Sequence, residues 1–268
     1  MEFAAITDTG RVRGNNEDCF GVAEEIELFV LSDGMGGYAS GEVASKIAVN
    51  SVLDHVRASE KNASLPLLGT PHPGASSVAQ RLASAVAIAN QAIRDEAEKN
   101  SARRGMGATI VAMQFHEQRV SIAHVGDSRA YRLRNGTLEQ LTDDHSFVAD
   151  QVRRGKMTQA EAETSKFQNV LMRALGPEPE VIVDISEEVV LDGDTFLLCS
   201  DGLSKELRST QIGATLGRTD GTEEIATRLI QMANDAGGED NITVVIVRFA
   251  PKLVGALVQK LGRWFRES

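Results

Sequence analysis

Two segments of the sequence share one order of residues: an apolar run, then Ser, Asp and Gly. Their aspartates are Asp33 and Asp201. A buried strand would hold the aspartate at its end firmly, and the glycine would let the chain turn sharply or let a ligand come close. Oxygen ligands on rigid elements are what hard divalent cations bind. The alternative is that Asp-Gly marks only a turn, which is our interpretation of Asp192 and Asp220, also followed by glycine.

Three other acidic groups also flank predicted strands: Asp240, Asp127, and the pair Glu17 and Asp18. No set of cysteine or histidine ligands accompanies them, which disfavours zinc and favours Mg²⁺ or Mn²⁺. Carboxylates that converge without a cation repel one another, and a bound metal removes that repulsion. Two ions that share a carboxylate would hold a water of lowered pKa and aim it at a phosphoryl group.

Arg13 precedes Asp18 by five residues and supplies the other requirement of such a site. A guanidinium binds phosphate oxygens through two parallel hydrogen bonds. The alternative is an exposed surface arginine with no part in binding.

Short strands and a few long helices must position these side chains. Apolar and β-branched runs predict strands at residues 3–7, 26–31, 109–115, 119–125, 129–133, 181–185, 195–199 and 242–249. Apolar residues at helical spacing predict helices at 41–57, 78–93 and 222–236. Polar residues 144–166 predict a surface excursion with short helical patches. The pattern favours a layered α+β domain over a regular βαβ repeat.

Composition sets the limits of this interpretation. The chain has 268 residues, 28 Lys and Arg against 38 Asp and Glu, and a net charge of −10. Its hydrophobic content of 42% is typical of a globular chain, and its acidity argues against nucleic-acid or anionic-membrane binding. The acidic excess fits either a solvated surface or carboxylates gathered around cations. Two cysteines, no signal-peptide pattern and no apolar run of membrane-spanning length predict a cytoplasmic protein.

These residues lie in motifs that resemble the bacterial branch of the metal-dependent PPM-type (protein phosphatase 2C) Ser/Thr phosphatases. Eight segments match in family order across residues 1–250: 13–18, 32–37, 106–109, 125–131, 141–146, 173–176, 198–203 and 238–243. The resemblance implies one phosphatase domain over 1–250, with a four-layer αββα sandwich around two central antiparallel sheets. It also implies that the excursion at 144–166 is a flap that influences substrate choice.

The resemblance implies a role for each site residue. Asp33 would bridge two Mn²⁺ or Mg²⁺ ions, with the Gly34 carbonyl on one of them and Asp201 and Asp240 on the other. Glu17 and Asp18 would act partly through metal-bound waters. Asp127 is similar to the ligand of a third, weaker metal in bacterial members. Arg13 would hold the substrate phosphate, and a metal-activated water would attack phosphorus without a phosphoenzyme.

Two departures from the family pattern concern histidines. Tyr38 stands where bacterial members usually carry His, and residues 165–169 stand where many carry His-Pro. The acid that protonates the leaving group is therefore unassigned, and a metal-bound water is one candidate. We interpret His145 as an anchor of the flap in preference to a catalyst, and His124 as a packing residue.

Residues 251–268 lie beyond the family domain and carry apolar residues at helical spacing together with four basic residues and one acidic residue. They predict an amphipathic helix. It would either dock on a membrane surface or a partner or pack on its own domain.

The sequence therefore predicts a phosphatase for phosphoserine and phosphothreonine in proteins, the counterpart of a Ser/Thr kinase. A first alternative is a catalytically weak relative that binds phosphoproteins as a regulator; the histidine departures favour it, and the intact Asp33, Asp201 and Asp240 argue against it. A second alternative is a phosphatase dedicated to one signalling protein.

Overall fold

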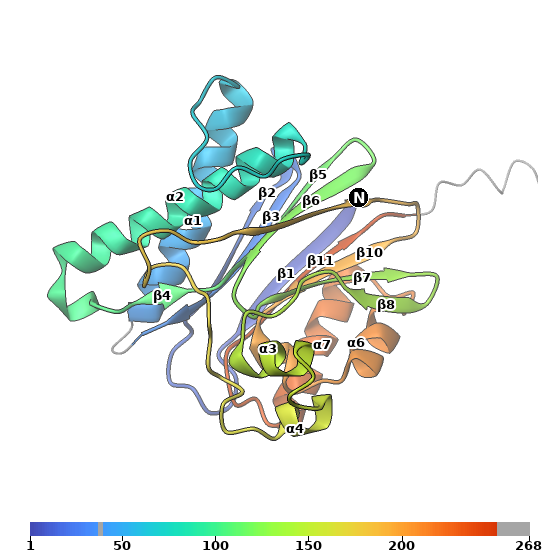
Figure 1. The fold of residues 1–268 in the computed structure, drawn as a ribbon. Coiled ribbons are helices and arrows are strands. Elements are labelled where there is room, and N and C mark those ends of the chain that lie inside the picture. The colour runs from blue at the N-terminus through green and yellow to red at the C-terminus, as the bar shows by residue number, and fades with distance from the viewer. Residues whose placement is uncertain (37–39, 251–268) are drawn as a thin grey trace, which may run out of the picture.

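Two antiparallel sheets stack face to face in the computed structural model, which describes residues 1–36 and 40–250. Helices cover both outer faces, so the predicted four-layer αββα sandwich is confirmed (Figure 1). Tyr38 and the predicted helix at 251–268 lie outside the described residues, and the helix stays a prediction.

The first and last strands of the described residues lie next to each other in the first sheet. Its order is β1 (Glu2–Asp8), β11 (Ile242–Arg248), β10 (Thr195–Cys199), β7 (Arg129–Arg134) and β8 (Thr137–Gln140). The second sheet has the order β2 (Asp18–Ala23), β3 (Leu28–Met35), β5 (Ile110–His116), β6 (Arg119–Val125) and β9 (Asp184–Val189), with β4 (Gly107–Ala108) paired to the end of β3.

Long helices pack outside each sheet. The second sheet is covered by α1 (Ser40–Lys61) and α2 (Ser77–Lys99), and the first by α6 (Ser209–Leu216) and α7 (Thr222–Ala236). The remaining elements are short: η1 (Glu24–Ile26), η2 (Ser101–Arg103), α3 (Phe147–Arg153), α4 (Gln159–Glu163) and α5 (Asp201–Ser204). None of the helices in the described ranges combines the length and hydrophobicity needed to cross a membrane.

Three hydrophobic layers hold the sandwich together. One lies between α1, α2 and the second sheet, one between the first sheet and α6 and α7, and one between the sheets. Phe29, Phe115 and Phe196 meet edge to face in the middle layer, with ring centroids 5.2–5.8 Å apart. Phe29 and Phe115 belong to the second sheet and Phe196 to the first, so the pair of Phe115 and Phe196 packs across the two sheets.

The antiparallel pairing determines where strand ends meet. The end of β3 lies beside the start of β2, so that Asp33 is directly opposite Asp18. The end of β10 likewise lies beside the start of β11, where Asp201 and Asp240 flank the two strands. The four acids therefore come to one edge of the sandwich.

One predicted strand begins later than expected. The run at 181–185 was predicted as a strand, but β9 starts at Asp184. Asn90 of α2 donates to the carbonyls of Glu178 and Pro179, and Val181 and Val183 pack into the layer under α1 and α2. Hydrogen bonds from a helix side chain, and not pairing with a neighbouring strand, therefore hold the start of this segment.

Candidate metal and phosphate site

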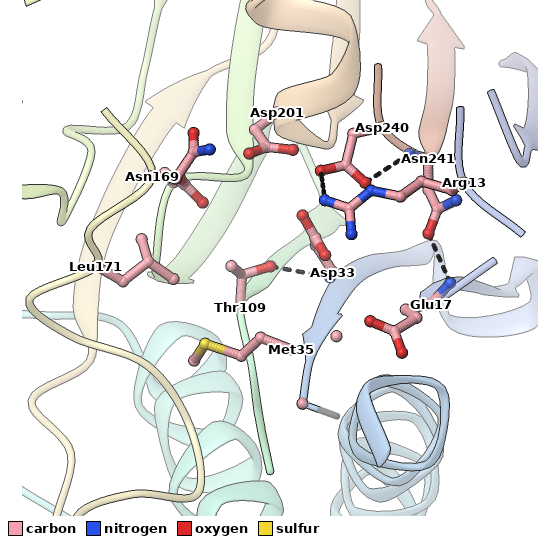
Figure 2. Close-up of a pocket in the computed structure, with 13 residues that line it drawn as sticks. Arg13, Glu17, Asp33, Met35, Thr109, Asn169, Leu171, Asp201, Asp240 and Asn241 are labelled. Carbon is pink, nitrogen blue, oxygen red and sulfur yellow. Dashed lines mark hydrogen bonds and ion pairs between the residues drawn. The ribbon is translucent and has the colours of Figure 1, made fainter. Parts of the chain in front are cut away.

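A cleft at the sheet edge brings together seven of the eight predicted site residues: Arg13, Glu17, Asp33, Gly34, Asp127, Asp201 and Asp240. Its other lining residues are Met35, Gly36, Thr109, Asn169, Leu171 and Asn241. Figure 2 shows Asp33 between Asp201 and Asp240 on one side and Glu17 on the other. The eighth predicted residue, Asp18, is not in the lining and lies beside Asp33 on β2.

Thr109 fixes the main chain at Asp33. The Asp33 N–H donates to Thr109 Oγ1 over 2.9 Å, and the Thr109 N–H donates to the Asp33 carbonyl over 2.8 Å. Thr109 Oγ1 also lies 2.7 Å from Ser128 Oγ, in the turn that carries Asp127. One threonine therefore connects two of the acids of the cleft.

Asp18 joins the two sheets. Its Oδ2 accepts hydrogen bonds from Oγ1 of Thr243, on β11, at 2.6 Å and from Oγ of Ser200, directly after β10, at 2.7 Å. Its Oδ1 is buried and has no hydrogen-bond partner in the described structure. One oxygen of Asp18 is thus structural, and the other is available for a ligand.

A close approach of main chains places Gly34 and Glu17. The Gly34 N–H donates to the Glu17 carbonyl over 3.1 Å. A Cβ at Gly34 would stand 2.0 Å from the Gly41 carbonyl oxygen, so only glycine fits here. The Gly in the Asp-Gly pair is therefore required by packing against the start of α1.

Asn241 organises the loop that carries Arg13 and Glu17. Its Nδ2 donates to the carbonyls of Thr9 and Asn15, each over 2.9 Å, and its Oδ1 accepts from the Glu17 N–H over 2.7 Å. Arg13 reaches across the cleft to Asp240, with 2.6 Å between NH2 and Oδ2 (Figure 2). The start of the chain is thus pinned to the start of β11.

Burial and mutual repulsion raise the pKa values of several acids at the cleft. The pKa of Asp18 is raised to about 7, chiefly by burial; the charges of Asp201 and Asp240 add to the rise, and the hydrogen bonds from Thr243 and Ser200 oppose it. Burial, with Asp18 and Asp201 next, also raises the pKa of Asp33 well above its usual range.

Asp127 behaves in the same way. Burial, followed by the charge of Asp201, raises the pKa of Asp127 to about 7, while Lys205 and Arg129 oppose the rise. The cleft therefore gathers more negative charge than the surrounding protein compensates.

These residues fit divalent cations by the character of their oxygens. Asp18 Oδ1 and Asp201 Oδ1 are buried without partners, and their carboxylates are shielded from water. Hard cations prefer carboxylate oxygens of this kind. No three acids among the described residues already stand as a ready-made metal group, and two of them contact cationic side chains instead: Asp240 contacts Arg13, and Asp201 contacts Lys205.

Neither His145 nor His124 lines the cleft. His145 Nδ1 accepts from the Gly126 N–H over 3.0 Å, and Nε2 lies 3.0 Å from Asp184 Oδ2. These contacts tie the Asp127 turn to β9 and support the anchoring interpretation. His124 is buried beside His145, and burial lowers its pKa to about 3, as expected for a packing residue.

The sequence interpretation missed Lys205 and Asn169. Lys205 contacts Asp201 and donates to Asn169 Oδ1 over 2.7 Å. The spacing of Asp201 and Lys205, four residues apart at the start of a helix, was the available signal. Nothing in the sequence places Asn169, which is 36 residues before Lys205.

Comparison with known proteins confirms the resemblance. The family described as Protein phosphatase 2C matches residues 11–245. A serine/threonine phosphatase stp from Listeria welshimeri is 39% identical over 244 residues, which cover 90% of this chain and 93% of that protein.

Solved structures agree with the fold. The crystal structure of the Mycobacterium tuberculosis phosphatase PstP/Ppp matches with a TM-score of 0.81 and 37% identity, over 93% of this chain and 98% of that one. The full-length M. tuberculosis PstP is longer, so the match covers 44% of it. A catalytic domain of PstP in complex with two manganese ions matches with a TM-score of 0.77 and 37% identity, over 91% of this chain and 96% of that one.

Proposed function

The chain belongs to the protein phosphatase 2C family of Mn²⁺- or Mg²⁺-dependent serine/threonine phosphatases, and we propose from this premise that it hydrolyses phosphoserine and phosphothreonine in proteins. In this proposal water at a binuclear metal site attacks the phosphate, without a phosphoenzyme. The observation that carries the proposal is the convergence of Arg13, Asp33, Asp201 and Asp240 in one cleft.

The chain's own residues have separate tasks in this proposal. Asp33, the Gly34 carbonyl, Asp201 and Asp240 would hold two ions, with Glu17 and Asp18 acting through waters. When bound, the ions would lower the pKa of water and neutralise phosphate charge. Arg13 would leave Asp240 and bind the phosphate oxygens, since its side chain is 51% exposed and free to turn.

No His, Cys, Tyr or Lys among the described residues lines the cleft, so none of these side chains is assigned as the acid that protonates the seryl or threonyl leaving group. Water in the cleft is therefore the proposed donor. The regulator alternative keeps the same fold and phosphate binding by Arg13 but lacks turnover.

One assay separates these functions. Purified protein is incubated with a phosphothreonine peptide, with Mn²⁺ or with chelator. We expect Mn²⁺-dependent turnover, and we expect Asp201→Asn to lower kcat by at least about a hundredfold. Asp220→Asn, in an exposed Asp-Gly turn, is the matched control. Turnover that survives Asp201→Asn would contradict the two-metal mechanism, and peptide binding without any turnover would favour the regulator.

The cellular role is a further proposal. Its substrates would be phosphorylated proteins, among them a Ser/Thr kinase in the cytoplasm. Residues 251–268 would dock on a membrane surface or a partner. Deleting them tests this: intact turnover with lost binding to anionic vesicles or partner supports docking, whereas lost stability supports packing on the domain.

A further inference from the structure

Lys205 is a basic residue beside the acids of the cleft to which the family resemblance assigns no role. It follows α5, four residues after Asp201, and its ammonium contacts Asp201 Oδ2. The side chain is 35% exposed and reaches the cleft edge. Partial burial would lower the pKa of Lys205, but Asp201, Asp127 and Asp33 raise it, so the ammonium stays charged.

The two carboxylate oxygens of Asp201 have different surroundings. Oδ2 is taken by Lys205, whereas Oδ1 is buried and has no partner among the described residues. A cation can therefore bind Oδ1 without displacing Lys205 from Oδ2. The contact with Lys205 also fixes the rotation of the carboxylate, because one oxygen cannot move without the other.

Asp127 lines the same cleft as Asp201, the partner of Lys205. Burial raises the pKa of the Asp127 carboxyl, and the positive charges of Lys205 and Arg129 oppose that rise. Arg129 uses Nε and NH2 on Asp144, at 2.9 and 2.7 Å, and NH1 on the Tyr131 hydroxyl at 2.9 Å. Lys205 is left as the charge that balances Asp127 and Asp201 together.

Lys205 also reaches the segment of α3 and α4. This segment closes where Ser146 bridges to Leu171, and Asn169 and Leu171 line the cleft. The Lys205 ammonium donates to Asn169 Oδ1 over 2.7 Å. One side chain thus touches both an acid of the cleft and the segment beside it.

From these contacts we propose that Lys205 is a built-in cation that fills the position between Asp127 and Asp201, limits the site to two divalent ions, and fastens the segment at Asn169 to it. The inference rests on the proposed function, because it concerns the same acids. Lys205 is a positioning residue, since it acts through Asp201 and Asp127.

The test counts bound Mn²⁺ per chain by equilibrium dialysis. We expect two ions in the wild type and a third, weaker one in Lys205→Met, where two buried carboxylates lose their counter-charge. Adding Asp127→Asn to Lys205→Met should return the count to two. Lys46→Met is the matched control, because Lys46 pairs with Glu42 at the same spacing on an exposed helix face.

Two results of the dialysis experiment would overturn the inference. One is a third ion in the wild type that Asp127→Asn removes, and the other is a count of two ions in Lys205→Met, unchanged from the wild type. The wild-type arm needs no lysine variant, so the inference can fail even if Lys205→Met does not fold. If the wild type binds no Mn²⁺ at all, the proposed function fails as well, which distinguishes the two failures.

Hydrogen exchange gives a readout that does not depend on metal. Lys205→Met and Asn169→Ala should each speed exchange of the amides at 165–171 by a similar factor, and the double variant should add nothing. Unchanged exchange in Lys205→Met would contradict the link to this segment.

Discussion

In two acids at the cleft, Asp18 and Asp201, one carboxylate oxygen contacts another side chain and the other oxygen has no partner among the described residues. Asp18 uses one oxygen to join the sheets and leaves the other without a partner. Asp201 divides its oxygens in the same way with Lys205. A carboxylate held on one side is already oriented when a cation arrives, and the site therefore depends on the neutral and basic residues around the acids.

Asn241 is the clearest case of a neutral residue that positions charged ones. Asn241→Ala removes three hydrogen bonds to the loop of Arg13 and Glu17. At about 1 kcal/mol each, the loss of unfolding free energy is about 2–3 kcal/mol. Urea unfolding measures this value, and Mn²⁺ affinity should fall with it.

The control is Asn62→Ala, which removes one exposed hydrogen bond to the Ser64 N–H. A change below about 0.5 kcal/mol is expected there. If the free energy of unfolding falls by the same small amount in Asn241→Ala and in Asn62→Ala, Asn241 does not hold the loop. The positions of Arg13 and Glu17 would then have another cause.

At the scale of elements, antiparallel pairing explains why acids far apart in sequence meet. The end of β3 and the end of β10 each lie next to the start of a neighbouring strand. Asp33 and Asp201 could be predicted from sequence because an apolar strand before Asp-Gly is a local pattern. Asn169 and the role of Asn241 could not, because their contacts cross loops whose course the sequence does not specify.

The same limit explains the error at β9. Val181 and Val183 have the composition of a strand, but Asn90 of α2 binds the carbonyls just before them. Local propensity indicates what a segment can form, and a tertiary contact decided the outcome here. The predicted helix at 222–236 agrees with α7, whose apolar residues pack in the layer outside the first sheet.

Gly34 tests the close packing at the end of β3. In Gly34→Ala the new Cβ would lie 2.0 Å from the Gly41 carbonyl oxygen and 2.8 Å from that of Glu17. Both are main-chain atoms, so a backbone must shift, and we expect a loss of about 1–3 kcal/mol of stability together with weaker Mn²⁺ binding.

Gly14→Ala is the matched control in the same measurement, because nothing lies within 4 Å of a Cβ at that position. Denaturant midpoints in chelator give the stability of both variants. Equal midpoints would show that the start of α1 yields to the added methyl group and that the contact does not fix the site.

On the scale of the whole molecule, the negative charge of −10 is concentrated in part at one sheet edge. In the metal-free protein, the carboxyls of Asp18 and Asp127 have pKa values of about 7 against 3.8 in the unfolded chain. Between about pH 4 and pH 7 these two carboxyls therefore hold more protons in the folded chain than in the unfolded chain, and the stability that they contribute falls as the pH rises.

Divalent cations reverse this trend, because they bind the deprotonated carboxylates. We expect Mg²⁺ to raise the melting temperature more at pH 8 than at pH 5.5. Calorimetric scans at both pH values, with a sodium salt at matched ionic strength as control, measure the difference. An equal or larger effect at pH 5.5 would mean that these acids do not bind the metal.

Crystals of this protein grown with Mn²⁺ and measured at the manganese absorption edge test the two-ion site directly. We expect two anomalous peaks in the cleft, both in contact with Asp33 and flanked by Asp201, Asp240 and the Gly34 carbonyl. Peaks elsewhere on the molecule, or none at this edge of the sheets, would contradict the two-ion site.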